Sequence, residues 1–146
     1  MNKLIKIFAV AAFGFMLTAC NGQSKSKAQS IAKSGTKIEV IDFHSTHRCM
    51  TCNAIEANTK YTLNTYFSKE LKGKKITFQS INVDEKVNEK VAEKFEASGT
   101  SLFLNIVKNG KEKQVDLTDF AFMNGTDKEK FSTGLKAKID AELKTL

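Results

Sequence analysis

Two cysteines separated by two residues lie between a stretch with the character of a β-strand and a stretch with the character of an α-helix. Residues 37–44 (KIEVIDFH) are rich in Ile, Val and Phe, which predicts a buried strand. Across residues 52–71 apolar side chains recur at close to helical spacing, and Gly73 is expected to end this helix. Cys49 and Cys52 therefore lie where a strand ends and a helix begins, which restricts the fold to those with a consecutive strand, cysteine pair and helix.

The rest of the chain continues the alternation of strands and helices. The pattern predicts strands at residues 76–83, 101–107 and 113–117, a helix over residues 85–97, and a last helix that begins at Thr126 or Asp127. The Asn109-Gly110 pair predicts a tight hairpin between the last two strands. A strand-helix-strand crossover implies parallel pairing, and the hairpin adds an antiparallel strand. The predicted fold class is α/β, in the order β-α-β-α-β-β-α, with a mixed four-stranded sheet.

Local expectations accompany these elements. Asp84 is expected to cap the second helix, whose apolar face would be formed by Val87, Val91 and Phe95. The apolar residues 120–123 (FAFM) are expected in a loop that covers the last helix. The core side of that helix would consist of Phe131, Leu135, Ile139 and Leu143.

The N-terminal residues have the anatomy of a secretory signal. Lys3 and Lys6 precede a short apolar run, which ends in small residues before Cys20. The run is shorter than the roughly 20 residues that a membrane span needs. The ending resembles the lipobox of bacterial lipoproteins, which implies cleavage after residue 19 and a diacylated Cys20. The alternative is an N-terminal helix with a buried cysteine.

Three segments follow from this interpretation. Residues 1–19 are predicted to be a lipoprotein signal peptide, residues 20–36 a lipid-anchored, Ser/Lys/Gln-rich tether, and residues 37–146 one folded domain. The predicted location is extracytoplasmic, on the periplasmic side of a bacterial membrane.

The net charge and the distribution of charged residues indicate which classes of partner the protein can bind. The formal net charge is +7, and it falls to +5 if Lys3 and Lys6 are removed with the leader. The remaining lysines are mixed with glutamates, and no aromatic residues interleave with a basic run, which argues against nucleic-acid binding. A positive field of this kind favours anionic membranes or partners.

The spacing of the cysteine pair indicates a reactive dithiol rather than a disulfide that stabilises the fold. Closing so short a loop removes little entropy from the unfolded chain, so a structural disulfide here would stabilise little. A helix N-terminus stabilises an anion, and Arg48 adds a positive charge beside it. We therefore expect Cys49 to be the exposed nucleophile and Cys52 the shielded, resolving thiol.

Several motifs resemble the thioredoxin superfamily across residues 37–145. Ile41-Asp42-Phe43 resembles the strand that ends before the active site, residues 81–84 (INVD) resemble the second strand, and Lys108-Asn109-Gly110 resembles its hairpin. The resemblance implies a three-layer thioredoxin-like fold, thiol–disulfide exchange, and a proton-relay role for Asp42. Residues 47–52 (HRCMTC) are most similar to small thioredoxin-like proteins of bacterial arsenic-resistance operons, labelled as a nitrophenyl-compound nitroreductase subunit, which implies reductase activity. The sequence has no flavin or nicotinamide motif, and no cofactor is expected.

Two departures from the superfamily pattern stand out. The chain has no proline, so the cis-proline that usually faces the cysteines is missing, and Thr100 and Ser101 are expected to face the redox loop in its place. No tryptophan precedes the first cysteine, where His47 and Arg48 stand.

The two histidines offer an alternative. His44 and His47 precede the cysteines, and two thiolates with an imidazole can bind zinc, copper or arsenite. The rival hypothesis is a metal- or metalloid-binding lipoprotein that uses His47, Cys49 and Cys52. For the redox hypothesis, the expected partners are protein disulfides or redox carriers, with a membrane electron donor if the protein is a reductase.

Overall fold

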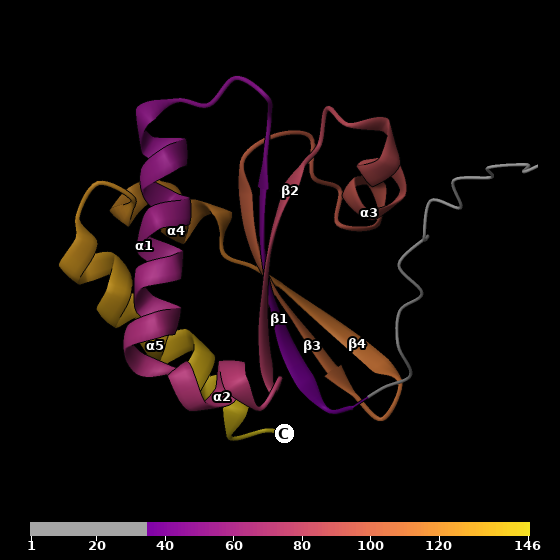
Figure 1. The fold of residues 1–146 in the computed structure, drawn as a ribbon, viewed down its shortest axis with the longest axis vertical. Coiled ribbons are helices and arrows are strands. Elements are labelled where there is room, and N and C mark those ends of the chain that lie inside the picture. The colour runs from indigo at the N-terminus through magenta and orange to yellow at the C-terminus, as the bar shows by residue number, and fades with distance from the viewer. Residues whose placement is uncertain (1–34) are drawn as a thin grey trace, which may run out of the picture. The chain divides into compact units, whose positions relative to one another are not determined.

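The computed structural model describes residues 35–146, and these residues build one sheet with helices on both of its faces (Figure 1). The elements in chain order are β1 (Lys37–His44), α1 (Met50–Tyr66), α2 (Ser68–Lys72), β2 (Ile76–Asn82), the 3-10 turn η1 (Lys86–Asn88), α3 (Glu89–Lys94), β3 (Ser101–Lys108), β4 (Lys111–Asp116), α4 (Thr118–Asn124) and α5 (Lys128–Leu143). The predicted signal peptide, Cys20 and most of the predicted tether lie outside the described residues.

The sheet has four strands in the order β2-β1-β3-β4. β1 pairs in parallel with β2, from Ile38 opposite Ile76 to His44 opposite Asn82, and antiparallel with β3. β3 and β4 form the antiparallel hairpin. The mixed α/β sheet predicted from the sequence is confirmed, and the strand bounds agree within a few residues. Because β1 and β2 are parallel, their carboxyl ends meet at one edge, beside the start of β3.

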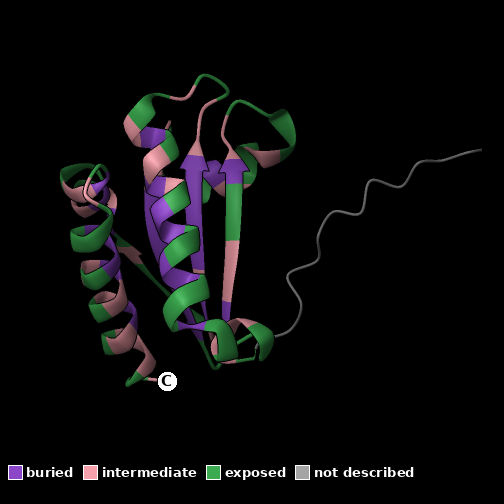
Figure 2. Cartoon of the chain, turned by 60° about the vertical axis from the view of Figure 1, so that its left-hand side comes forward, coloured by how far each residue is buried: buried purple, intermediate pink, exposed green. Residues whose placement is uncertain are grey.

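Each face of the sheet carries its own apolar core. The face under α1, α4 and α5 holds the larger cluster, which includes Ile38, Val40, Ile55, Leu63, Leu102, Leu104, Phe131, Leu135 and Ile139. On the opposite face Phe43, Phe95 and Phe103 lie with ring centroids 5.3–5.9 Å apart. Figure 2 shows the buried side of α1 turned toward the sheet. The two cores fix β1 between the layers.

Alternation along β1 places one charged residue among apolar ones. Side chains two residues apart point to the same face, so Asp42 shares the α1 face with Ile38 and Val40. Asp42 is fully buried. A carboxylate therefore lies inside the domain, under the helix that begins at the cysteine pair.

The first helix is interrupted, which the sequence pattern did not reveal. α1 ends at Tyr66, Phe67 leaves the helical conformation with φ −127° and ψ 26°, and α2 follows as a separate short helix. Gly73 does not supply the left-handed residue, since its φ is −78°; Lys74 takes that conformation, with φ 55°. The change of direction at Phe67, itself 2% exposed, lets Leu71 pack against the larger core.

The predicted helix over residues 85–97 is too long. Only η1 and the short α3 form there, and Val87 is 82% exposed instead of buried. The Asp84 carboxylate, which was expected to cap the helix, accepts a hydrogen bond from the Thr46 N–H at 2.7 Å. Because this side chain is engaged by the loop before the cysteines, the regular helix begins only at Glu89.

The FAFM segment is helical, which corrects the expectation of a loop. It lies within α4, where Ala121 is buried and the Phe120 ring lies 5.4 Å from that of Phe131. Phe120 covers α5 as expected, whereas Phe122 and Met123 are exposed.

The other local expectations hold. Asn109 and Gly110 have φ values of 52° and 75°, which the twist of a tight hairpin demands. Asp127 caps α5 by accepting from the Lys130 N–H. Phe131, Leu135 and Ile139 are fully buried, while Leu143 is partly buried. Among the residues described, no helix is both long and apolar enough to cross a membrane.

Candidate redox site

Cys49 and Cys52 form a disulfide at the carboxyl-end edge of β1 and β2. The two sulfurs are 2.09 Å apart and the Cα atoms 5.0 Å apart. Cys49 is exposed, whereas Cys52 is 8% exposed. The predicted asymmetry between an outer and a shielded cysteine is therefore present.

Cys49 is also the N-cap of α1. Its backbone is extended, and its Sγ accepts a hydrogen bond from the Cys52 N–H at 3.0 Å. The first turn of α1 holds no acidic residue that would oppose a negative charge. Free N–H groups and the helix dipole stabilise an anion at such a position. The fold thus provides a favourable site for a Cys49 thiolate after reduction.

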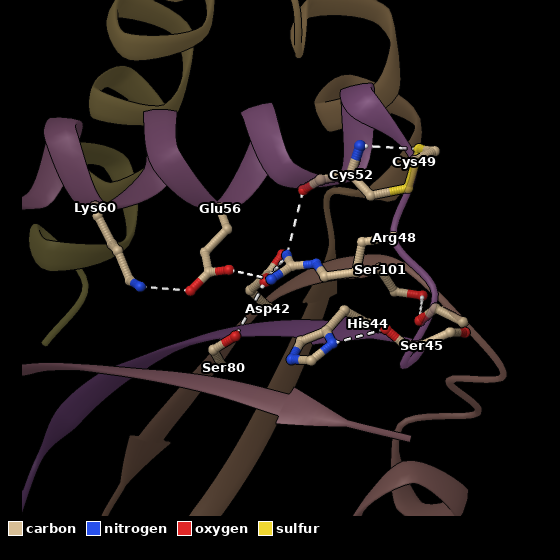
Figure 3. Close-up of polar contacts among 11 residues, drawn as sticks. Asp42, His44, Ser45, Arg48, Cys49, Cys52, Glu56, Lys60, Ser80 and Ser101 are labelled. Atoms are coloured by element: carbon tan, nitrogen blue, oxygen red, sulfur yellow. Dashed lines mark hydrogen bonds and ion pairs between the residues drawn. A yellow bond between two sulfur atoms is a disulfide. The ribbon is translucent and has the colours of Figure 1, made fainter. Parts of the chain in front are cut away.

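Arg48 points away from the solvent and into the domain (Figure 3). Its Nη1 donates to Glu56, and its Nη2 donates to Asp42 and to the Cys52 carbonyl oxygen, each at 3.3 Å. The guanidinium charge is shared by two carboxylates, so the N-terminus of α1 is the better-placed source of positive potential at Cys49. Arg48 connects β1, the disulfide loop and α1.

The two carboxylates around Arg48 respond in opposite directions. Burial raises the pKa of Asp42 from 3.8 to about 6, against the opposing charge of Arg48. Burial also raises the pKa of Glu56, but hydrogen bonds and charges from Lys60 and Arg48 outweigh it and lower this pKa to about 2. Asp42 Oδ1 is buried and has no hydrogen-bond partner among the described residues. Asp42 is therefore the carboxyl group at this site that can change protonation near neutral pH.

The loop that carries Arg48 is held from the side by β2. The Asp84 carboxylate accepts from the Thr46 N–H, and this hydrogen bond lowers the pKa of Asp84. The Asn82 side-chain amide donates to the Thr46 hydroxyl at 3.0 Å. These contacts fix the approach of the chain to Cys49.

The first turns of α1 are held from the other side by Gly125. A Cβ at this position would lie 2.8 Å from the Ala121 carbonyl oxygen, 3.0 Å from Ile55 and 3.1 Å from Thr51. The Asn58 side-chain amide also donates to the Gly125 carbonyl oxygen at 2.9 Å. The turn after α4 therefore lies so close to α1 that a side chain at this position would require its neighbours to shift.

We expect Gly125→Ala to destabilise the oxidised protein by about 1–3 kcal/mol, because the added methyl group must displace the Ala121 carbonyl group of α4 and crowds the Ile55 and Thr51 side chains of α1. Urea unfolding measures the change. Gly35→Ala is the matched control, since a Cβ there meets nothing within 4 Å. Equal stability of the two variants would contradict the close packing.

The remaining predicted residues lie around this centre. Ser101 begins β3 opposite Phe43, and its hydroxyl donates to the Gly99 carbonyl oxygen at 3.4 Å. Thr100 precedes it and is half-buried. His44 Nδ1 lies 3.0 Å from the Ser45 carbonyl oxygen.

His47 is exposed on the loop before the cysteines. Within residues 35–146 no group of three or more His, Cys, Asp or Glu side chains is arranged to hold a metal ion. His47, Cys49 and Cys52 do not form such a group, so the metal-binding alternative gains no support from this geometry.

Three residues of the site were not found from the sequence. Glu56 and Ser80 contact Arg48 and Asp42, and Asp84 holds the loop. Glu56 follows Cys49 by seven residues and Cys52 by four, a spacing that places it on the same helix face. That spacing was the available signal, whereas nothing local marks Ser80, which reaches Asp42 through strand pairing.

The comparisons with known proteins agree with the fold. No family model and no curated protein matches the sequence. Among solved structures, the Trx4 domain of ERdj5 is similar with a TM-score of 0.52 at 15% identity, over 77% of this chain and 84% of that domain. A Fasciola hepatica thioredoxin aligns with a TM-score of 0.40 at 21% identity, over 61% of this chain and 77% of its own. A Plasmodium falciparum thioredoxin gives 0.42 at 20%, over 65% and 73%.

The fold is thioredoxin-like, as the sequence motifs implied. Its Cys49–Cys52 disulfide lies at the start of the first helix, after the first strand of the sheet.

Proposed function

We propose that this protein is a thiol–disulfide oxidoreductase that works outside the cytoplasm from a lipid anchor at Cys20. The observation that carries the proposed activity is the pairing of an exposed Cys49 with a shielded Cys52 at the N-terminus of α1. A structural disulfide that closes so short a loop would stabilise the protein little, and it would not require an exposed sulfur.

The proposed reaction exchanges one disulfide for another. In the reduced protein the Cys49 thiolate attacks a sulfur of the substrate disulfide, and one substrate thiolate leaves. The Cys52 thiol, once deprotonated, attacks Cys49 Sγ in the mixed disulfide. This step releases the second substrate thiolate and re-forms the Cys49–Cys52 bond. Two electrons pass to the substrate, whose two sulfurs leave as thiols after protonation; the reverse sequence oxidises a dithiol.

Asp42 is the proposed acceptor of the Cys52 proton. It lies buried under the start of α1 and has one unpartnered oxygen, and Arg48 contacts both its carboxylate and the Cys52 backbone. Its pKa of about 6 allows a proton to be taken up and returned near neutral pH. Arg48 is proposed to position the loop, and Thr100 and Ser101 to face the docked substrate chain in place of a proline.

The proposed substrates are protein disulfides or redox carriers. Reductase work outside the cytoplasm needs electrons from a membrane donor, which would then be a required partner. The similarity of residues 47–52 to nitroreductase-labelled proteins is a similarity of motif, and thiol–disulfide exchange is the reaction that the cysteine geometry supports. A measured reduction potential at or above that of glutathione would contradict the reductase direction.

Trapping of mixed disulfides tests the proposed activity. In the full chain, Cys52→Ala should accumulate covalent partners through Cys49, because the resolving thiol is missing, whereas Cys49→Ala should trap at least about tenfold less because Cys52 is shielded. Non-reducing gels followed by mass spectrometry measure the adducts. Both variants retain one thiol of the pair, so they control for general thiol reactivity. Equal trapping by the two variants, or none by Cys52→Ala, would overturn the assignment.

A further inference from the structure

The end of the domain opposite the disulfide is basic. Backbone contacts bring the start of β1 to the turn before β2, where the Ile38 N–H donates to the Lys75 carbonyl oxygen. The Lys108 ammonium donates to the Thr145 carbonyl oxygen, which brings the β3–β4 hairpin to the C-terminus. Figure 1 shows α2, the hairpin and the C-terminus at the lower end, with the start of α1 at the upper end. We call this lower end the basic pole, and besides Lys108 its exposed lysines are Lys69, Lys72, Lys74, Lys75, Lys111 and Lys144.

These lysines are free to meet an external anion. None of the six makes a salt bridge with another described residue. Of the acidic residues nearby, Glu39 pairs with Lys37, Glu112 with Lys94 and Glu142 with Lys113, which leaves Glu70 on α2 against the six lysines. Lys74 holds a left-handed backbone, which lets the turn after α2 project its side chain. The pole therefore keeps a net positive charge that the domain does not neutralise.

The opposite end carries exposed acids. Asp84 and Glu85 follow β2, and Asp116 and Asp119 lie at the end of β4 and the start of α4. Both strands end at the edge where the disulfide lies, because β4 runs in the same direction as β1. Lys86 and Lys90 also follow β2, but the exposed acids outnumber them there, so the positive end of the domain is the one away from the cysteines.

We propose that the basic pole docks on an anionic phospholipid surface and so directs the Cys49–Cys52 end away from the bilayer. The described chain enters β1 at the same pole, so an anchor at Cys20 would hold this end near the membrane. Covalent geometry limits the fifteen residues from Asn21 to Gly35 to about 50 Å. Lysines within a Debye length of about 8 Å feel the surface potential of an anionic leaflet, and the reversed orientation is disfavoured because it would bring the acidic end within that distance.

A bilayer fits these observations better than a nucleic acid. The lysines are spread over three separate segments, α2 with its turn, the hairpin and the C-terminal end. All six are lysines rather than the forked arginines that suit the recognition of nucleic-acid phosphates. The proposal is independent of the redox reaction, because it concerns only the face on which the domain rests.

Partition onto vesicles tests the proposal with the full chain carrying Cys20→Ser, which cannot be acylated. The measured quantity is the ratio of binding to vesicles of 30% phosphatidylglycerol in phosphatidylcholine, roughly physiological in surface charge, over binding to pure phosphatidylcholine. This ratio cancels the apolar contribution of the N-terminal residues, and the lysines before Gly35 contribute equally in every variant compared. The basic-pole variant, Lys72→Gln with Lys74→Gln and Lys111→Gln, should lower the ratio by about 10–100-fold, since each lysine near the surface contributes roughly fivefold.

The control removes the same charge elsewhere. Lys86→Gln with Lys90→Gln and Lys130→Gln leaves the pole intact and should lower the ratio by less than about threefold. Far-UV circular dichroism and the rate of disulfide reduction by dithiothreitol report whether each chain is folded. Equal loss in both variants, or a ratio near one for the unmodified pole, would overturn the proposal. Polyuridylate binding that is tighter than vesicle binding and is lost in the basic-pole variant would also overturn it, in favour of RNA.

Discussion

Arg48→Met should destabilise the oxidised protein by about 3–5 kcal/mol at pH 8, the usual cost of removing one partner from a buried ion pair. The substitution keeps most of the side-chain volume but leaves Asp42 without a cation and Glu56 with Lys60 as its remaining partner. Both carboxylates lie largely out of solvent, with side-chain exposures of 0% and 15%. The repulsion between them raises the pKa of Asp42 beyond its value of about 6.

The size of this loss should depend on pH. An acid whose folded pKa is raised costs stability above that pKa, and the cost disappears once the group is protonated in both states. The destabilisation should therefore shrink to about 1–2 kcal/mol near pH 4, where lost hydrogen bonds and packing remain. Urea unfolding at the two pH values measures it. Lys60→Met is the control: it removes the other, half-exposed partner of Glu56 and should cost less than about 1 kcal/mol. A loss that is equal at both pH values would show that packing, not charge, accounts for the role of Arg48.

Asp42→Asn should have the opposite effect and stabilise the oxidised protein by about 2–3 kcal/mol at pH 8. The pKa of Asp42 is raised from 3.8 to about 6, and a shift of this size corresponds to about 3 kcal/mol of cost when the group is ionised. The cost is absent below pH 3.8, where the carboxyl is protonated in both the folded and unfolded chain, and grows as pH rises through 6. The amide removes the charge and keeps the shape, while Arg48 retains Glu56 as a partner.

A pH series of unfolding free energies checks this expectation. The stability difference between Asp42→Asn and the unmodified protein should be near zero at pH 3.5 and should reach its full value by pH 8. Asp119→Asn makes the same chemical change at an exposed position and should change stability by less than about 0.5 kcal/mol at every pH. A destabilised Asp42→Asn at pH 8 would mean that the ion pair with Arg48 outweighs the burial of the carboxylate.

The pattern of apolar residues predicted the strands of the sheet because buried strand faces require apolar side chains, which are visible in the sequence. β1 matches its predicted bounds, since Ile38, Val40 and Phe43 must all be covered. The hairpin followed from Asn109 and Gly110, whose conformations are local. Cys49 as the exposed outer sulfur followed from its place at a helix start. These features depend on neighbours in sequence, which a reader of the sequence can see.

The features that could not be predicted depend on partners distant in sequence. Asp84 has the residue type of a helix cap, and only the pairing of β1 with β2 brings it to Thr46, 38 residues earlier. From the sequence, the charge of Arg48 was expected to stabilise a Cys49 thiolate. The sequence does not show that this charge is shared with Asp42 in β1 and Glu56 in the second turn of α1. In the sequence, Glu56 resembles a solvent-exposed helix residue, and only the structure shows that Arg48 donates to its carboxylate. Charged residues carry no periodic signal of burial, so the ion network required the structure.

The hydrogen bond from the Cys52 N–H to Cys49 Sγ has a consequence for the speed of electron transfer. The acceptor sulfur is in the disulfide now, and after reduction the same atom can keep the same donor as a thiolate. The helix cap therefore does not have to be rebuilt when the pair changes redox state, and little rearrangement accompanies each turnover. The oxidised centre already has the hydrogen bond that its reduced form needs. We therefore expect the rate of disulfide exchange to depend more on binding of the partner than on a conformational change in this chain.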